Sequence, residues 1–201
     1  MKKITILIVL VIMCSSCSKL YEKYSFGGIH VTYHTGYCFI DENGQNTVDA
    51  LPLIEWSPKS VPSEEATSGM ISTDEFSLEC TLSDPTRLSD FPKGDFAVPN
   101  VHIEAFDSKR YFVITLALYT KWSNFQDVIS FDLACPQLFG DDETHHIETF
   151  WRNHTQQRAG KKVPSYFPEC YRIDIDGNSA NDFTFDIDRY VPTLCQVELD
   201  K

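Results

Sequence analysis

Positive charge is scarce in this chain of 201 residues. It holds 17 Lys and Arg against 29 Asp and Glu, so its formal net charge is −12 at pH 7. Nucleic-acid binding depends on Lys and Arg side chains that neutralise phosphates. Adsorption to anionic lipid depends on the same positive charge. The composition therefore argues against a nucleic-acid partner and against electrostatic adsorption of the protein to a membrane.

Familiar catalytic motifs are also missing. The sequence contains no G-x-S-x-G elbow, no H-E-x-x-H, no Walker A sequence and no dinucleotide-binding glycine pattern. The carboxylate pair Asp141-Asp142 could serve glycoside hydrolysis, but the chain is short for a groove-forming glycosidase. These observations disfavour an enzyme and keep hydrolysis only as a secondary alternative.

The N-terminus, by contrast, is distinctive. Lys2 and Lys3 precede an unbroken apolar run over residues 4–13, and small residues then lead to Cys17. This order is that of a secretory signal with a charged region, an apolar region and a small-residue cleavage site. The apolar run is about half as long as the roughly 20 residues that a transmembrane helix needs.

The sequence Cys14-Ser15-Ser16-Cys17 resembles the lipobox of bacterial lipoproteins, in which small residues precede the cysteine that is lipidated. Cys14 stands where Leu is usual, and Cys17 is the favoured acceptor because bulky Met13 would precede a cut before Cys14. The resemblance implies a signal peptide over 1–16, a lipidated tether over 17–27 and one domain over 28–201. It also implies several acyl chains on Cys17, which suffice for stable anchoring.

Removal of residues 1–16 would take away two lysines and no acid, so the remaining chain would carry 15 − 29 = −14 charges. The lipid would then have to hold the protein at the membrane by itself. Ser18-Lys19 lacks the acidic cluster that often follows the cysteine of surface-exported Bacteroidetes lipoproteins, which favours a periplasm-facing position in the outer membrane. Residues 39–44 and 135–141 look like stretches of uncharacterised lipoproteins of the same type, a likeness that implies no activity.

Five further cysteines follow, none of them in a CxxC pair, so a zinc site built from close cysteines is not supported. Export would permit disulfides, and the odd number leaves at least one thiol unpaired. Buried free thiols that pack as small hydrophobic groups are the equal alternative. The pairing stays open for Cys38, Cys80, Cys135, Cys170 and Cys195.

Short apolar runs separated by turns fill the rest of the chain. Residues 76–82 and 128–133 alternate apolar and polar side chains, which indicates half-buried strands. Residues 111–118 are apolar on both faces, as in a central strand, and Asn43-Gly44 predicts a hairpin whose second strand covers 48–56. Other strands are predicted over 29–40, 101–106, 145–151, 171–175, 183–187 and 193–199.

The predicted fold is therefore all-β, an antiparallel β-sandwich of immunoglobulin-like type. Long loops are expected over 57–73, 83–100 and 153–169, with a shorter one over 136–144. The third long loop holds most of the one basic patch of the chain, which consists of Arg152, Arg158, Lys161 and Lys162.

A candidate calcium loop lies between two of the predicted strands. Oxygen donors recur at alternate positions after Asp174, and Ca²⁺ takes six to eight oxygen ligands. The spacing resembles the D-x-D-x-D-G-x-x-D loops of β-rich extracellular proteins, although Ser179 replaces the usual glycine. The alternative is a polar hairpin that turns at Gly177-Asn178. By that resemblance the ligands are Asp174, Asp176, Asn178, the Ala180 carbonyl and Asp182.

Two other residue groups are candidate ligand sites. His145, His146 and His154 lie near acidic residues and could bind zinc, but exposed loop histidines are the commoner explanation. Trp56, Trp122 and Trp151 could stack on sugars, but Trp56 and Trp151 are more typical of a core. Trp122, at a predicted turn, is the best candidate for carbohydrate contact.

The sequence thus predicts a membrane-anchored lipoprotein, lipidated at Cys17, that acts as a non-catalytic binding or assembly module of the cell envelope. Its expected partners are the membrane, through the lipid, and an envelope protein or glycan, with calcium as the candidate cofactor. The alternative function is glycan handling, as a carbohydrate binder or, less favoured, a glycoside hydrolase.

Overall fold

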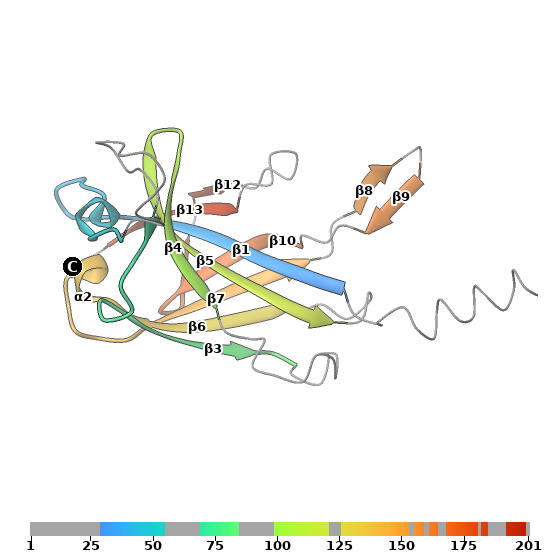
Figure 1. Cartoon of the computed structure of the whole chain (residues 1–201), viewed down its shortest axis with the longest axis horizontal. Helices are drawn as coiled ribbons and strands as arrows, with labels where there is room; N and C mark the ends of the chain where they lie inside the picture. Colours follow the sequence, from blue (N-terminus) through green and yellow to red (C-terminus); the bar gives the residue numbers. More distant parts are fainter. Residues whose placement is uncertain are drawn as a thin grey trace, which may run out of the picture.

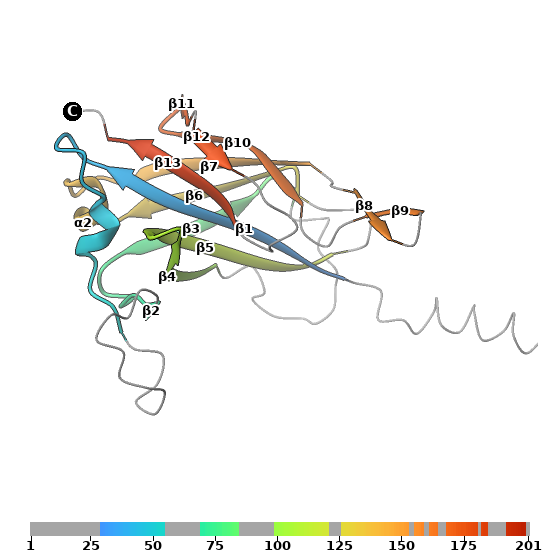
Figure 2. The same cartoon turned by 90° about the horizontal axis from the view of Figure 1, so that it is seen from above.

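The computed structural model describes residues 29–54, 69–84, 99–120, 126–152, 155–158, 161–164, 168–180, 182–184 and 192–199. Two β-sheets form the body, as Figures 1 and 2 show. The first sheet has six strands in the order β12-β13-β1-β5-β4-β2, and the second has five in the order β11-β10-β7-β6-β3. A separate hairpin, β8-β9, lies outside both sheets. The predicted all-β sandwich is confirmed.

The strands of the first sheet are β1 (Ile29–Ile40), β2 (Gly69–Met70), β4 (Asn100–Phe106), β5 (Lys109–Thr120), β12 (Asp182–Thr184) and β13 (Thr193–Glu198). The second sheet holds β3 (Ser77–Leu82), β6 (Val128–Ala134), β7 (His145–Arg152), β10 (Glu169–Ile175) and β11 (Asn178–Ser179). The hairpin joins β8 (Thr155–Arg158) to β9 (Lys161–Pro164), and two short helices are η1 (Thr47–Ala50) and α2 (Pro136–Phe139).

Strand order in the first sheet adds one feature that local patterning did not predict. The first strand, β1, pairs in parallel with the last, β13, whereas the other pairings are antiparallel. In an immunoglobulin constant-type domain the first and last strands belong to opposite sheets. The sandwich described here has both in one sheet, so its strand order differs from that arrangement.

The core lies between the inward faces of the two sheets. Tyr33 of β1 meets Trp151 of β7 edge to face, with 5.0 Å between ring centroids, so the sheets interdigitate directly. The alternation predicted for β6 is confirmed, since Ile129, Phe131 and Leu133 are all buried. Residues 111–118 are also confirmed as a central strand, because β5 lies between β1 and β4.

The hairpin predicted after Asn43-Gly44 is wrong in its second half. The chain does turn there, with Gly44 at a φ of 74°, but η1 follows in place of a strand over 48–54. The side chain of Asn46 accepts a hydrogen bond from the Val48 amide and so caps this helix. Burial of Val48 and Leu51 then stabilises a compact turn rather than an extended strand.

Three expected loops also contain regular structure, and the first of them, 57–73, includes the short strand β2. Pro136, which suits the first turn of a helix, begins α2, and Gly140 ends it in the left-handed conformation. The expected loop 153–169 contains the β8-β9 hairpin. No helix among the described residues is long and apolar enough to cross a membrane.

The five cysteines that follow residue 17 are free thiols, and all but Cys80 are buried. Burial raises the pKa of Cys170 to about 12 and that of Cys80 to about 11. They pack as small hydrophobic groups, which was one of the two alternatives left open by the sequence.

Candidate functional site

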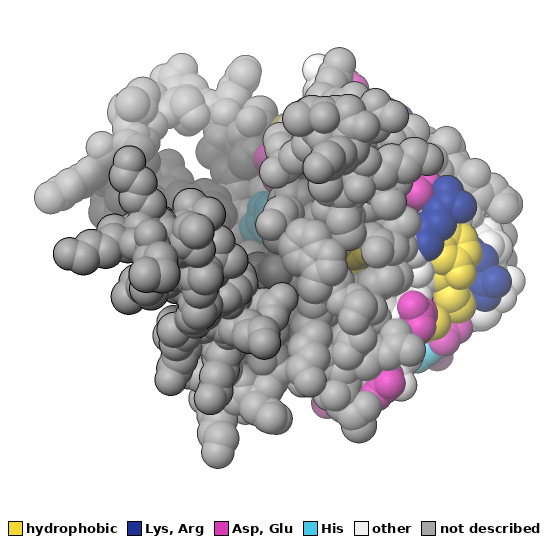
Figure 3. All heavy atoms as spheres, turned by 90° about the vertical axis from the view of Figure 1, so that its right-hand side faces the viewer, with side chains coloured by type: hydrophobic (Ala, Val, Ile, Leu, Met, Phe, Trp, Pro, Cys, Tyr) yellow, Lys and Arg dark blue, Asp and Glu magenta, His cyan; other side chains and the backbone are white. Residues whose placement is uncertain are grey.

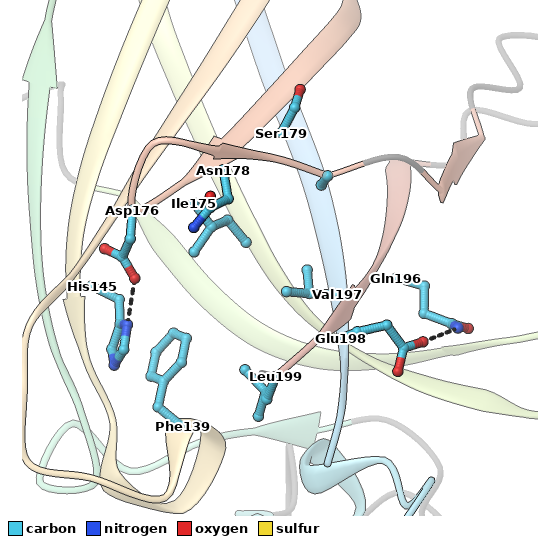
Figure 4. Close-up of a pocket in the computed structure, with 11 residues that line it drawn as sticks. Phe139, His145, Ile175, Asp176, Asn178, Ser179, Gln196, Val197, Glu198 and Leu199 are labelled. Carbon is cyan, nitrogen blue, oxygen red and sulfur yellow. Dashed lines mark hydrogen bonds and ion pairs between the residues drawn. The ribbon is translucent and has the colours of Figure 1, made fainter. Parts of the chain in front are cut away.

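A cleft of about 410 Å³ lies where the two sheets meet at one edge. Figure 4 shows that β10, β11 and their turn form one wall and β13 of the first sheet the other, with α2 below. Ile175, Val197, Leu199 and Phe139 supply an apolar lining. Polar side chains surround it, contributed by Asp176, Asn178, Ser179, Gln196 and Glu198.

The wall formed by β10 and β11 depends on a tight turn. Asp176 has a φ of 51° and Gly177 a φ of 78°, so two consecutive residues are left-handed. Asp-Gly is a preferred pair for two-residue hairpin turns of this kind. The turn pairs Ile175 with Asn178 and Asp174 with Ser179. The polar hairpin considered for this segment is therefore observed, with its turn one residue earlier than expected.

His145 joins two acidic residues at the side of the cleft. Its Nδ1 lies 2.7 Å from Oδ2 of Asp176, and its Nε2 lies 3.0 Å from Oδ1 of Asp141. Only 16% of the His145 side chain is exposed, against 44% for Asp176 and 45% for Asp141. With a carboxylate at each ring nitrogen, the imidazole is placed to donate two hydrogen bonds as imidazolium.

The two carboxylates favour the charged form of this histidine. Burial by itself lowers the pKa of His145, but the hydrogen bonds and charges of Asp176 and Asp141 together outweigh it and raise the pKa. The hydrogen bond with His145, helped by the Glu143 amide, lowers the pKa of Asp141. Because both ring nitrogens of His145 have carboxylate partners, this residue holds the β10-β11 turn against residues 139–141.

Phe139 completes this arrangement from α2. Its ring stacks on that of His145, with 3.7 Å between centroids and 20° between planes. The stack places an aromatic face between His145 and the apolar lining of the cleft, as Figure 4 shows. The cleft therefore offers an apolar interior close to an acidic rim.

The neighbouring His146 forms a separate pair on the outer side of β7. Its Nδ1 lies 2.6 Å from Oδ1 of Asp132, and that hydrogen bond is the main cause of its raised pKa. Both side chains are about half exposed. Its backbone amide donates to Oδ1 of Asp176, which secures the turn a second time.

The predicted calcium ligands serve other partners in this structure. Only 9% of Asp174 is exposed, although it lies on the same face of β10 as the half-exposed Arg172. Its Oδ2 accepts from the Arg172 guanidinium and its Oδ1 from the Ser179 hydroxyl. These partners cover the carboxylate on the outer face of β10 and satisfy it without solvent. Asp176 instead contacts His145 and the His146 amide.

Of the remaining predicted ligands, Asn178 and Ala180 line the cleft, and the side chain of Asp182 lies outside the described residues. Across the part of the chain that the structure describes, no group of three or more His, Cys, Asp or Glu is arranged to hold a metal. Calcium binding stays a prediction. Isothermal titration calorimetry with Ca²⁺ tests it, and the absence of heat at millimolar calcium would end it.

The structure describes one of the three tryptophans that were candidates for the core or for sugar contact. Trp151 is 3% exposed and its Nε1 donates to Oγ1 of Thr149, which confirms it as a core residue. Cys17, Trp56 and Trp122 lie outside the described residues.

A second surface feature, on the outer face of β7 and β10, was not predicted. The guanidinium carbon of Arg172 lies 3.8 Å from the centroid of Phe150, and that of Arg152 lies 5.7 Å from the centroid of Tyr171. Arg152 also forms a bidentate pair with Glu169. Figure 3 shows hydrophobic side chains flanked by basic ones and bordered by acidic ones on the described surface.

The His145 arrangement was also missed, although part of its signal was visible. His145 follows Asp141 by four residues, so the sequence itself shows this histidine close to an acidic residue. Asp176 is 31 residues further along the chain, and only the pairing of β7 with β10 brings it close. No family model, curated protein or solved structure matches the chain.

Proposed function

We propose that the protein is a bacterial lipoprotein, anchored through Cys17 in the outer membrane and facing the periplasm, that acts as a non-catalytic binding or assembly module of the cell envelope. The observation that carries the proposal is the N-terminal sequence. Two lysines, an apolar run of half a membrane span and the Cys14-Ser15-Ser16-Cys17 lipobox follow one another in the order of a lipoprotein signal.

The position of the cleft supports a binding role for such an anchored protein. β1 begins at Ile29, only 11 residues (18–28) after Cys17, and runs along the length of the sandwich (Figure 1). The Leu199 amide donates to the carbonyl of Ile40, so the cleft lies beside the far end of β1. A strand of 12 residues spans roughly 40 Å, which holds the cleft away from the lipid.

The lining of the cleft indicates the chemistry of its partner. Val197, Leu199 and Phe139 favour an apolar group, while Asp176 and Glu198 favour a positive charge or hydrogen-bond donors beside it. A segment of an envelope protein that carries an aliphatic side chain next to a Lys or Arg has both properties. We infer that such a segment is the ligand.

The anchor and the cleft are tested separately. Mass spectrometry of the membrane fraction should find acyl chains on Cys17, and Cys17→Ala should release the protein from membranes. Crosslinking in cells should then capture envelope proteins with the wild type and fewer with Glu198→Lys. Glu79→Lys is the matched control, because Glu79 is exposed on β3, away from the cleft. Equal capture by the two charge-reversed variants would contradict the cleft as the binding site.

A glycan-handling protein is the alternative function, and the outer face of β7 and β10 favours it. Tyr171 is 43% exposed and is flanked by Arg152, an arrangement that suits stacking on a sugar ring. A glycan array would separate the two functions. Saturable binding that is lost in Tyr171→Ala or Trp122→Ala favours glycan handling, whereas an array without signal favours a protein partner.

A further inference from the structure

The β8-β9 hairpin projects beyond the sandwich at the end where β1 begins. Figures 1 and 2 show this in two perpendicular views. The hairpin lies between β7, which ends at Arg152, and β10, which begins at Glu169. Because β1 begins at the same end, the hairpin is on the side of the molecule to which the chain from Cys17 is attached.

The hairpin concentrates the scarce positive charge of the protein. Residues 149–168 include Arg152, Arg158, Lys161 and Lys162 and no Asp or Glu. Arg158 pairs with Lys161 next to the turn, and Gln157 pairs with Lys162 one step further along. Three positive residues therefore occupy neighbouring register positions around one turn.

This arrangement is unfavourable for the hairpin itself. Like charges at directly opposite positions of an antiparallel pair are destabilising, and Arg158 lies opposite Lys161. A two-stranded hairpin outside a sheet is in any case only marginally stable in water. The sequence thus concentrates repulsion where the fold tolerates it least, and an anionic surface would relieve it.

At the opposite end of the sandwich, acidic residues outnumber the basic ones, which include Lys109 and Arg110 at the start of β5. The turns at this end carry Asp41 and Glu42 after β1, residues 141–143 after α2, and Asp176 after β10, with Glu198 beside the cleft. The two ends are roughly 40 Å apart along β1. The Debye length at physiological salt is about 8 Å, so the acidic end is screened from a surface that the hairpin touches.

We propose that the β8-β9 hairpin binds the anionic phospholipid headgroups of the membrane that carries the Cys17 lipid. The inference rests on the proposed anchor. The 11 residues between Cys17 and Ile29 span at most roughly 40 Å when extended, so the anchor holds this end of the sandwich near the headgroups. Docking of the hairpin then fixes the orientation of the domain and turns the cleft away from the membrane.

The expected effect is appreciable because the anchor has already brought the hairpin to the surface. Each Lys or Arg near an anionic membrane raises the ratio of docked to undocked hairpin about fivefold. For the three charges of the hairpin this amounts to a factor on the order of a hundred at low salt. The factor should fall steeply as salt shortens the Debye length to about 3 Å at 1 M.

The test uses the full lipidated protein in vesicles of phosphatidylcholine, with and without phosphatidylglycerol. Amide hydrogen exchange is followed by mass spectrometry in residues 155–164, with 193–199 as the internal reference at the far end. We expect exchange in 155–164 to slow in the anionic vesicles only and to recover at high salt. The triple variant Arg158→Gln, Lys161→Gln and Lys162→Gln should lose this protection, whereas Lys109→Gln, at the far end, should keep it.

The failure of the anchor and the failure of the hairpin give different results. If the wild type carries no acyl group and does not float with the vesicles, the anchor is wrong and the inference falls with it. If the wild type floats but residues 155–164 exchange equally in both vesicles, the anchor stands and the docking of the hairpin is refuted. Thermal melts of each variant show whether the sandwich is intact.

Discussion

Replacement of His145 by Phe should make the stability of the domain less dependent on pH. The phenyl ring can keep the stack on Phe139, whose centroid lies 3.7 Å from that of His145. It cannot hydrogen-bond to Asp176 or Asp141, and it does not titrate. The substitution therefore removes the charge pairing at the cleft while it preserves most of the packing.

The pH range follows from the direction of the shift. The pKa of His145 is raised in the folded state, above the unfolded value of about 6.5. Its contribution to stability is therefore complete below about pH 6.5 and is lost as the pH rises through the folded-state pKa. Asp141 determines the lower end of this pH range. Its pKa is lowered in the folded state, so its contribution to the stability of the domain is lost as the pH falls through that folded-state pKa.

The size of the effect on the free energy of unfolding depends on how exposed the His145–Asp176 ion pair is. Solvent-exposed ion pairs contribute about 0.2–1 kcal/mol, and the His145–Asp176 pair lies near the upper limit because the histidine side chain is only 16% exposed while the aspartate is 44% exposed. We therefore expect the substitution to lower the free energy of unfolding by about 1 kcal/mol more at about pH 5.5 than at about pH 8.5.

Urea unfolding of the Cys17→Ala chain, with and without His145→Phe, measures this difference at each pH under reducing conditions. The His146–Asp132 pair is retained in both proteins, so its own pH dependence cancels to first order. Parallel stability curves for the two proteins across this range would refute the assignment of a charged His145 between two carboxylates.

Three further predictions concern stability and reactivity. Thr149→Val should cost about 1–3 kcal/mol in urea unfolding because it leaves the buried Nε1 of Trp151 without its acceptor, whereas Thr149→Ser should restore most of the loss. Gly177→Ala should cost about 1–2 kcal/mol in the same assay, since a φ of 78° is unfavourable for alanine; an added Cβ would meet nothing within 4 Å, so a much larger loss would contradict this reasoning. The folded protein should react slowly with a thiol reagent, because burial raises the pKa of Cys80 to about 11 and that of Cys170 to about 12. Partly exposed Cys80 should react first, and rapid labelling of Cys170 before unfolding would contradict its burial.

Alternation of apolar and polar residues predicted most strands because each strand has one face in the core. Residues 128–133 and 145–151 carry this pattern and form β6 and β7. The pattern failed over 48–54, where the apolar residues Val48 and Leu51 are three apart. That spacing buries both on one side of a short helix as readily as in an extended chain.

The candidate site was less predictable because it depends on contacts that are distant in sequence. The donors of residues 174–182 suggested one centre, but in the structure Asp176 contacts His145, 31 residues away, and Asp174 contacts Arg172 on its own strand. Short sequence spacing does not specify which face of a hairpin each carboxylate occupies. The arginines and histidines that compete for those carboxylates lie on strands whose pairing is set by the whole sheet.

The net charge of the chain likewise does not indicate how its charged residues are arranged in the fold. A net charge of −12 determines the attraction or repulsion of other charged molecules only at long range. At physiological salt, charges further apart than about 8 Å are largely screened from one another. If the proposed anchor and hairpin contact hold, the charges that matter at the membrane are those of the element nearest to it, the β8-β9 hairpin with Arg158, Lys161 and Lys162. The overall acidity is thus compatible with the proposed basic contact at the end where β1 begins and with an acidic cleft at the other end. An anchored domain with this distribution would be held with its cleft toward its partners, whereas the same charges spread evenly over the surface would orient nothing.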